Sequence, residues 1–218
     1  ETSFNLNSTK AKLQYGKTEL LVETELVGEY NLLNIMAALA VCMDIGIPTQ
    51  NIEQSIKSLP PIPGRLEQVS CDCPGKVFID YAHTPDAYEK LLSNLTELKD
   101  KGDNIITVFG CGGDRDTGKR SKMAEISDAY AAFSFITMDN PRTESLEKIN
   151  TDIIQGFSGS NYEIISDRNT ALETALSRMD DHSILLVLGK GREDYQEIGA
   201  KKRPYSDVEI IKGFQHAD

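Results

Sequence analysis

A carboxylate and a guanidinium stand close together after an apolar segment in the middle of this sequence. Residues Phe133 to Thr137 have the composition of a β-strand, and Met138-Asp139-Asn140-Pro141-Arg142 follows them. Pro141 blocks continuation of the strand because it lacks a backbone donor and fixes φ. Ligands of open α/β sheets gather at the carboxyl ends of strands. Asp139 could meet an ammonium there and Arg142 a carboxylate, which suits a small zwitterion, although Asn-Pro also occurs in ordinary turns.

Three more polar loops follow predicted strands. They are Asp80-Tyr81-Ala82-His83-Thr84-Pro85, Gly110-Cys111-Gly112-Gly113-Asp114-Arg115-Asp116 and Gly189-Lys190-Gly191-Arg192-Glu193-Asp194. The glycines at 110–113 either cradle an anion near a helix start or simply make a tight turn, and their spacing is not that of a P-loop. His83 is either a purine or phosphate contact or a hydrogen-bonded turn residue. Four such loops on one sheet edge favour a binding site more strongly than any one of them does.

Apolar and amphipathic segments alternate from residue 76 onward. We expect strands at Lys76–Asp80, Ile105–Phe109, Ala132–Thr137, Tyr162–Ile165 and Ile184–Leu188, and helices at Pro85–Leu98, Lys119–Tyr130, Ser145–Gly156, Asn169–Arg178 and Asp207–Phe214. This alternation indicates right-handed βαβ units. The predicted fold class is therefore α/β, a Rossmann-like and mostly parallel sheet with helices on both faces.

The residues before this region follow a different pattern. Polar and apolar residues alternate on both sides of a Gly16-Lys17 turn, which predicts a β-hairpin. Residues Asn31 to Asp44 are apolar almost all round, which predicts a buried helix. The proline-rich segment Pro60 to Gly64 predicts a domain boundary. Because so short an N-terminal part cannot form a matching second domain, we expect it to be the tail of something larger, and the chain to be a fragment.

Composition excludes several classes of protein. A net charge of −11 and a pI near 4.8 argue against a broad nucleic-acid surface. No apolar run approaches the roughly 20 residues of a membrane span, and the N-terminus does not resemble a signal peptide. The spacing of Cys42, Cys71, Cys73 and Cys111 suits neither a disulfide framework nor a metal site. We therefore expect reduced thiols, a cytoplasmic location, and neither nucleic-acid nor membrane partners.

Six motifs, spread in order over essentially the whole chain, resemble those of the Mur ligases. They are Gly28-Glu29-Tyr30-Asn31-Leu32-Leu33-Asn34, Pro63-Gly64-Arg65-Leu66-Glu67, the loops that begin at Asp80 and Gly110, Asp139-Asn140-Pro141-Arg142, and Gly189-Lys190-Gly191-Arg192-Glu193-Asp194-Tyr195-Gln196. The resemblance implies that residues 1–62 are the α+β tail of a central ATPase domain and residues 63–218 a C-terminal Rossmann-like domain. It also implies that the UDP-binding domain, the ATP-binding P-loop, a carbamylated lysine and the metal-binding residues lie outside this sequence.

The resemblance is strongest to the ligases that add meso-diaminopimelate during peptidoglycan synthesis. It implies that ATP phosphorylates the D-glutamyl carboxylate of UDP-N-acetylmuramoyl-L-alanyl-D-glutamate, and that an amine of meso-diaminopimelate attacks the acyl phosphate. Magnesium is expected to bridge the nucleotide phosphates in the full-length enzyme. The fragment alone is expected to be inactive and to contain no catalytic or metal-binding residue. The alternatives are a stand-alone amino-acid or nucleotide-binding module and a glutamate-adding relative such as a folylpolyglutamate synthase, against which Asp-Asn-Pro-Arg argues.

Site residues follow from the same resemblance. The expected ATP contacts are Asn31, Asn34, Arg65, Asp80 and His83, and the expected amino-acid contacts are Arg115, Asp139, Asn140, Arg142, Gly189 and Glu193. The distal end of meso-diaminopimelate carries both charges, which Arg142 and Glu193 would meet. Lysine lacks the distal carboxylate and would leave Arg142 unpaired, so the motif favours meso-diaminopimelate. Arg192 stands where relatives often have His, which leaves the charge beside the pocket open.

Overall fold

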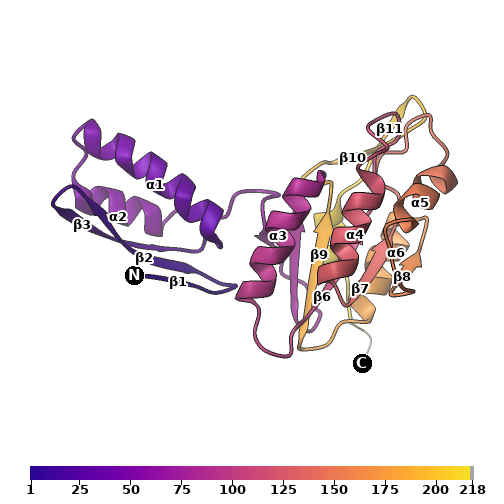
Figure 1. Ribbon diagram of the computed structural model, residues 1–218, viewed down its shortest axis with the longest axis horizontal. Helices are drawn as coiled ribbons and strands as arrows, with labels where there is room; N and C mark the ends of the chain where they lie inside the picture. The colour runs from indigo at the N-terminus through magenta and orange to yellow at the C-terminus, as the bar shows by residue number, and fades with distance from the viewer. Residues whose placement is uncertain (217–218) are drawn as a thin grey trace. The chain divides into compact units, whose positions relative to one another are not determined.

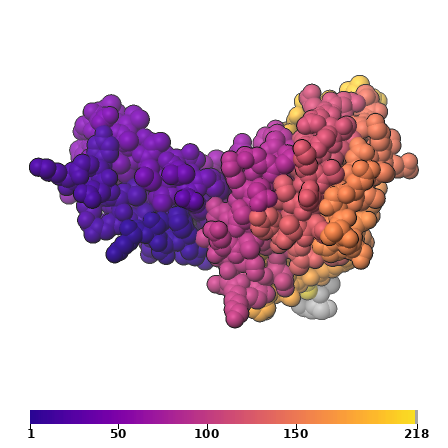
Figure 2. All heavy atoms as spheres, viewed as in Figure 1, coloured from indigo at the N-terminus to yellow at the C-terminus, as the bar shows by residue number. Residues whose placement is uncertain are grey.

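Residues 1–216 are described in the structure, a computed structural model. The chain divides into two compact units, Glu1–Ile62 with Asn94–Asp100 and Pro63–Ser93 with Lys101–Asp218. Figure 1 shows the helices and strands of each unit, and Figure 2 shows all heavy atoms as spheres in the same view. The assignment of residues 1–62 and 63–218 to two Mur ligase domains stays a prediction.

The first unit combines a small antiparallel sheet with two helices. Its strands are β1 (Thr2–Phe4), β2 (Thr9–Tyr15) and β3 (Thr18–Thr24), and its helices are α1 (Glu29–Asp44) and α2 (Thr49–Lys57). Tyr15 pairs with Thr18 across the two-residue turn that the sequence predicts, where Gly16 has a φ of 60°. Alternate residues of the strands, including Leu20 and Val22, form a core with Ile35, Leu39, Ile52 and Ile56 of the helices.

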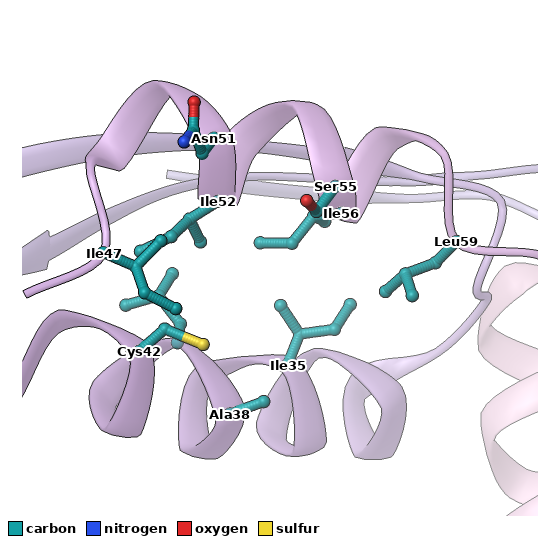
Figure 3. Close-up of a pocket in the computed structure, with 10 residues that line it drawn as sticks. Ile35, Ala38, Cys42, Ile47, Asn51, Ile52, Ser55, Ile56 and Leu59 are labelled. Carbon is teal, nitrogen blue, oxygen red and sulfur yellow. The ribbon is translucent and has the colours of Figure 1, made fainter. Parts of the chain in front are cut away.

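Helix α1 is not buried all round, so that part of the sequence prediction is wrong. Its buried residues are Asn31, Leu32, Ile35 and Leu39, whereas Leu33, Met36 and Val41 are exposed. A helix turns its side chains in all directions, and only one face of α1 meets the sheet and α2 within the first unit. Between α1 and α2 lies an apolar cavity of about 170 Å³, into which Ile35, Ile56 and Leu59 point in Figure 3.

The second unit is built on a six-stranded sheet. Its strands are β4 (Glu67–Gln68), β5 (Lys76–Asp80), β6 (Asn104–Phe109), β7 (Phe133–Ile136), β8 (Tyr162–Ile164) and β9 (Ser183–Leu188), in the spatial order β4-β5-β9-β6-β7-β8. Strands β5 to β9 are parallel, and only the two-residue edge strand β4, which the sequence did not predict, is antiparallel. The carboxyl ends of five strands therefore lie on one edge.

Helices cover both faces of this sheet, as predicted. They are α3 (Pro85–Leu98), α4 (Arg120–Tyr130), α5 (Leu146–Ile154), α6 (Arg168–Ser177) and α7 (Asp207–Gly213). The chain moves one way along the sheet from β5 to β8 and returns to β9 through α6, so right-handed crossovers put α6 on the opposite face. Tyr88 of α3 accordingly packs against Phe109, while Leu172 of α6 shares a core with Val108 on the other face.

A β-hairpin follows the last strand of the sheet and was not predicted from the sequence. Strands β10 (Tyr195–Ile198) and β11 (Lys201–Pro204) pair with each other around Gly199. The hairpin also pairs with the polar loop after β7: the N–H of Arg142 donates to the carbonyl of Glu197 at 3.0 Å, and the N–H of Gly199 donates to the carbonyl of Arg142 at 2.7 Å. The hairpin thus fixes the backbone of a predicted site residue.

The expectation of reduced thiols is wrong for two cysteines. Cys71 and Cys73 form a disulfide with a Cα–Cα distance of 5.4 Å, and both pack against the core of the second unit. The loop between β4 and β5 folds back far enough for residues two positions apart to meet. Cys42 and Cys111 are free thiols. Within residues 1–216, no helix combines the length and the apolarity that crossing a membrane requires.

Candidate functional site

A polar cavity of about 320 Å³ lies among the loops that follow the strands of the second unit. Its lining is Tyr81, His83, Gly112, Arg115, Asp116, Lys119, Asp139, Asn140, Arg142, Gly189 and Glu193. All six residues predicted for the amino acid, and His83 from the nucleotide set, therefore surround one space. Tyr81, Gly112, Asp116 and Lys119 also line the cavity and were not predicted as site residues, although all lie within or just after the polar loops. Three cations and three carboxylates line the cavity, so it suits a ligand that carries both charges.

Two glycines allow the loops after β6 and β7 to touch. A Cβ on Gly110 would overlap the carbonyl oxygen of Thr137, and a Cβ on Gly113 would overlap that of Pro141. The N–H of Gly113 instead donates to the carbonyl of Asn140 at 2.9 Å. Of the two roles that the sequence left open for these glycines, an anion cradle or a tight turn, the geometry shows a close approach of two backbones.

The loop after β6 is further held by Asp114, which has a φ of 55°. Its carboxylate accepts hydrogen bonds from the N–H of Thr143 at 3.0 Å and from the Thr143 hydroxyl, and these bonds lower the pKa of Asp114. Arg115 follows directly and is exposed. Within residues 1–216, its guanidinium makes no ion pair or hydrogen bond, so it is available to an anionic ligand group.

The side chain of Arg120 supports the loop after β6. Its side chain is fully buried and forms ion pairs with Glu144 at 2.6 Å and with Asp152 at 2.8 Å. Its Nη2 also donates to the carbonyl of Gly112 at 3.1 Å. The hydrogen bond from Arg120 lowers the pKa of Glu144 to about 2. We call Arg120, Glu144 and Asp152 the Arg120 cluster; its side chains hold a wall of the cavity without lining it.

Arg142 adopts a φ of 52°, which turns its side chain back toward the cavity. Its Nε pairs with Glu197 of the hairpin at 2.9 Å, and its Nη1 donates to the carbonyl of Gly113 at 2.9 Å. Within the described residues, Nη2 has no hydrogen-bond partner. The protein thus fixes two nitrogens of the guanidinium and leaves the third for a ligand carboxylate.

Asn140 and Glu193 meet at the buried side chain of Lys190. The ammonium of Lys190 donates to Asn140 Oδ1 at 3.0 Å, to Glu193 Oε2 at 3.2 Å and to the carbonyl of Tyr195 at 2.9 Å. Asn140 Oδ1 also accepts from the N–H of Glu197, and its Nδ2 donates to Glu193 Oε2 at 3.0 Å. We call Lys190, Asn140 and Glu193, together with Asp139, the Lys190 cluster.

Asp139 was predicted to meet an ammonium, and the ammonium it meets in the structure belongs to the protein. Its Oδ1 lies 3.2 Å from Nζ of Lys190. The contact is ionic only, since this buried oxygen accepts no hydrogen bond from residues 1–216. Lys190 lies within the Gly-Lys-Gly segment of a predicted polar loop, but nothing in its spacing indicates that its side chain turns inward, so no role for it could be predicted.

The residues predicted for ATP lie in both units. Asn31 and Asn34 are on α1, where Asn31 is buried and its Nδ2 donates to the carbonyl of Val27, while Asn34 is exposed. In the second unit, Arg65 is exposed and its guanidinium lies 5.3 Å from the ring centroid of Tyr81.

Asp80 is the buried member of the predicted ATP set. One carboxylate oxygen accepts the N–H of Leu66 and the other that of Ala82, both at 2.6 Å, while burial raises its pKa. His83 is exposed, and its ring Nδ1 lies 2.9 Å from the carbonyl oxygen of Tyr81, to which it donates a hydrogen bond in the tautomer protonated at Nδ1. Asp80 thus orders the loops on which Arg65 and His83 stand.

Two charged or reactive side chains near the cavity serve other purposes. Arg192 does not line the cavity, because its guanidinium pairs with Glu67, which also accepts the N–H of Gly64 at 2.7 Å. Burial would raise the pKa of Glu67, but these hydrogen bonds lower it overall.

Burial raises the pKa of Cys111 to about 12, which keeps it a thiol. No group of three or more His, Cys, Asp or Glu within residues 1–216 is arranged to hold a metal ion.

Comparison with known proteins connects this site to a family. The family described as "Mur ligase, glutamate ligase domain" matches residues 64–191. The UDP-N-acetylmuramoyl-L-alanyl-D-glutamate--2,6-diaminopimelate ligase of Chlamydia trachomatis serovar D is 43% identical over 190 residues, which are 87% of this chain and 39% of that protein. A solved structure of a ligase of the same name superposes with a TM-score of 0.71 at 33% identity, over 97% of this chain and 43% of that one.

A more distant neighbour shares the fold alone. The Mycobacterium tuberculosis folylpolyglutamate synthase, solved with ADP and AMPPCP, superposes with a TM-score of 0.71 at 20% identity, over 87% of this chain and 44% of that one. The chain spans less than half the length of each of these relatives. Since the family match covers more than half of the chain and includes all of the cavity loops except the one ending at Glu193, the chain belongs to the Mur ligase family.

Proposed function

We propose that this chain is the C-terminal part of an ATP-dependent ligase that adds meso-diaminopimelate to UDP-N-acetylmuramoyl-L-alanyl-D-glutamate in peptidoglycan synthesis. Relatives whose names state a 2,6-diaminopimelate ligase support the proposal, at 43% and 33% identity. The partners would be these two substrates, ATP, and the N-terminal and central domains of the same protein. The chain matches less than half the length of its relatives, which supports the presence of those domains in the full-length protein. The reaction would take place in the cytoplasm, where ATP is available.

The charge composition of the cavity is the observation that carries the proposal. Arg115, Lys119 and Arg142 face Asp116, Asp139 and Glu193 across about 320 Å³. meso-Diaminopimelate is neutral overall, with two ammonium and two carboxylate groups. Lysine would leave a guanidinium unpaired, and glutamate would leave a carboxylate unpaired, and each unpaired charge in a partly closed site costs affinity.

The donors and the acceptor that remain available in the cavity indicate which group of the ligand each would bind. Nη2 of Arg142 and the free guanidinium of Arg115 are the donors for carboxylates. Glu193 uses only Oε2 within the described residues, so its Oε1 is free for an ammonium. Held in this way at its distal end, the amino acid keeps its other amine free to attack the activated glutamyl carbonyl, whose C–O bond to phosphate breaks as the amide forms.

ATP, when bound, supplies the phosphoryl group that activates the glutamyl carboxylate. Arg65 and His83 are exposed side chains suited to phosphates, and Asp80 orders their loops, so these residues fit a nucleotide. Asn31 and Asn34 would contact the adenine. Magnesium, held by residues outside this chain, would neutralise charge on the ATP phosphates in the full-length protein.

A ligation assay tests the proposal. The full-length protein is incubated with ATP, UDP-N-acetylmuramoyl-L-alanyl-D-glutamate and either meso-diaminopimelate or lysine, and the product is measured by mass spectrometry. We expect kcat/KM to be at least about 100-fold higher with meso-diaminopimelate. Equal use of lysine, or no ligation, would contradict the proposal; binding of meso-diaminopimelate without ligation would favour a binding module.

A second assay tests the need for the missing domains. Residues 1–218 alone are expected to fold but to release no phosphate from ATP in the presence of both substrates. Turnover by this fragment would show that the chain contains a complete active site.

A further inference from the structure

Lys190 is buried without touching the cavity. Its side chain has 0% exposure, and lysine is rarely found so deep unless its charge is paired. The ammonium contacts four oxygens, and the aromatic rings of Tyr195 and Tyr205 lie 5.9 and 5.7 Å away. Three of the four oxygens belong to side chains that line the cavity.

This one ammonium connects those three side chains. Asn140 Oδ1 and Glu193 Oε2 both accept hydrogen bonds from Nζ of Lys190. Asn140 Nδ2 donates to the same oxygen of Glu193, so Lys190, Asn140 and Glu193 are each bonded to the other two. Asp139 Oδ1 has no hydrogen bond within residues 1–216, so Lys190 is its counter-charge. Within the described residues, each carboxylate contacts Lys190 through one oxygen, and both side chains line the cavity.

We propose that Lys190 is a positioning residue for the amino-acid substrate: it aims Asn140 and Glu193 at the ligand and neutralises Asp139. The inference rests on the proposed function, because it assigns a role within the same site. Lys190 also pairs with Glu193, but within the described residues it does so through Oε2, so Oε1 of Glu193 is the acceptor for a ligand ammonium. Loss of Lys190 would remove the shared counter-charge of Asp139 and Glu193, and would leave Asn140 Oδ1 with the N–H of Glu197 as its remaining donor.

Steady-state kinetics of the full-length protein test this role. Lys190→Met has a similar length and no charge, and we expect it to raise the KM for meso-diaminopimelate about 100-fold while the KM for ATP stays within about twofold. Lys190→Arg keeps the charge but cannot place a single nitrogen at the same point, and we expect about a tenfold rise. A merely structural role would lower the amount of active enzyme, and so kcat, without this split between the two KM values.

Lys202→Met is the matched control. Lys202 is exposed and its ammonium lies 3.8 Å from the ring centroid of Tyr195, so it contacts the same aromatic ring without reaching the cavity oxygens. All kinetic constants of this variant should equal those of the wild type. If Lys190→Met does not fold, Lys190→Arg decides the question alone: an unchanged KM for meso-diaminopimelate would overturn the proposal.

A double-mutant cycle shows whether Lys190 acts through Glu193. Glu193→Gln removes the charge that Lys190 holds, so Lys190→Met should raise the acceptor KM much less in that background than in the wild type. Equal effects in the two backgrounds would overturn the proposal. Failure of the wild type to ligate meso-diaminopimelate would instead contradict the proposed function, so the two failures are distinguishable.

Discussion

The Arg120 cluster and the Lys190 cluster both place a fully buried cation beside the same cavity, but they do different work. Arg120 pairs with Glu144 and Asp152, which do not line the cavity, and fixes the carbonyl of Gly112. Lys190 pairs with side chains that do line it. A buried charge therefore does not by itself mark function; its partners decide whether it supports the fold or the ligand.

The largest effect is expected at Arg142. Its guanidinium contacts Gly113, in the loop that the Arg120 cluster holds, and Glu197, whose N–H donates to Asn140 of the Lys190 cluster. Arg142→Ala removes a cavity guanidinium that the structure holds by an ion pair and a hydrogen bond, and we expect the KM for meso-diaminopimelate to rise about 100- to 1,000-fold. Kinetics of the full-length protein measure it, with Arg192→Ala as the control because Arg192 is an arginine outside the cavity. An unchanged KM would remove Arg142 from the binding site.

Removal of Arg120 should affect stability rather than selectivity. Arg120→Met leaves Glu144 and Asp152 without their counter-charge, and we expect the free energy of unfolding to fall by about 3–5 kcal/mol. Urea unfolding measures the change. The control is Lys148→Met, which removes an exposed partner of Glu144 at 3.4 Å and should cost less than about 1 kcal/mol. A loss as small as that of the control would mean that the Arg120 cluster does not hold the fold.

The Arg120 cluster should also make stability depend on pH. The pKa of Glu144 is about 2 in the folded protein against 4.5 for a free side chain, so its contribution is present above about pH 4.5 and is lost as the pH falls toward 2. The midpoint of urea unfolding should decrease over this range, and less steeply in Glu144→Gln than in the wild type. Parallel pH profiles for the two proteins would contradict the assignment.

The smallest effect is expected at the half-exposed pair of Arg192 and Glu67. The Arg192 side chain is 46% exposed, so Arg192→Ala should change the free energy of unfolding by less than about 1 kcal/mol. Thermal or urea unfolding measures this change. A loss of several kcal/mol would show that the pair, and not only the two buried cations, holds the loops together.

Strands and helices of the second unit were predictable because burial leaves a pattern along the chain. Continuous apolar residues in Ser183–Leu188 indicate a strand covered on both sides, and the structure buries every one of them. The β10–β11 hairpin leaves no such pattern, since Lys201–Pro204 are all exposed and charged or polar for the most part. It is stabilised by its turn and by the loop at Arg142, which are not visible as hydrophobic periodicity.

The polar loops of the candidate site were predictable, but their internal contacts were not. Strand ends show where Asp139, Arg142 and Glu193 stand, because parallel strands bring their carboxyl ends to one edge. Side-chain direction does not follow from position: Arg192 and Lys190 are two residues apart, yet one pairs with Glu67 at the surface and the other is fully buried. Partners such as Glu197 are 55 residues from Arg142, beyond the reach of local patterns.

A crystal structure of the full-length protein with meso-diaminopimelate tests the central claim most directly. We predict that the ligand lies in the cavity of the second unit, with one carboxylate within hydrogen-bond distance of Nη2 of Arg142 and one ammonium within hydrogen-bond distance of Oε1 of Glu193. Density for the amino acid at another site, with both of these atoms left facing solvent, would contradict the account.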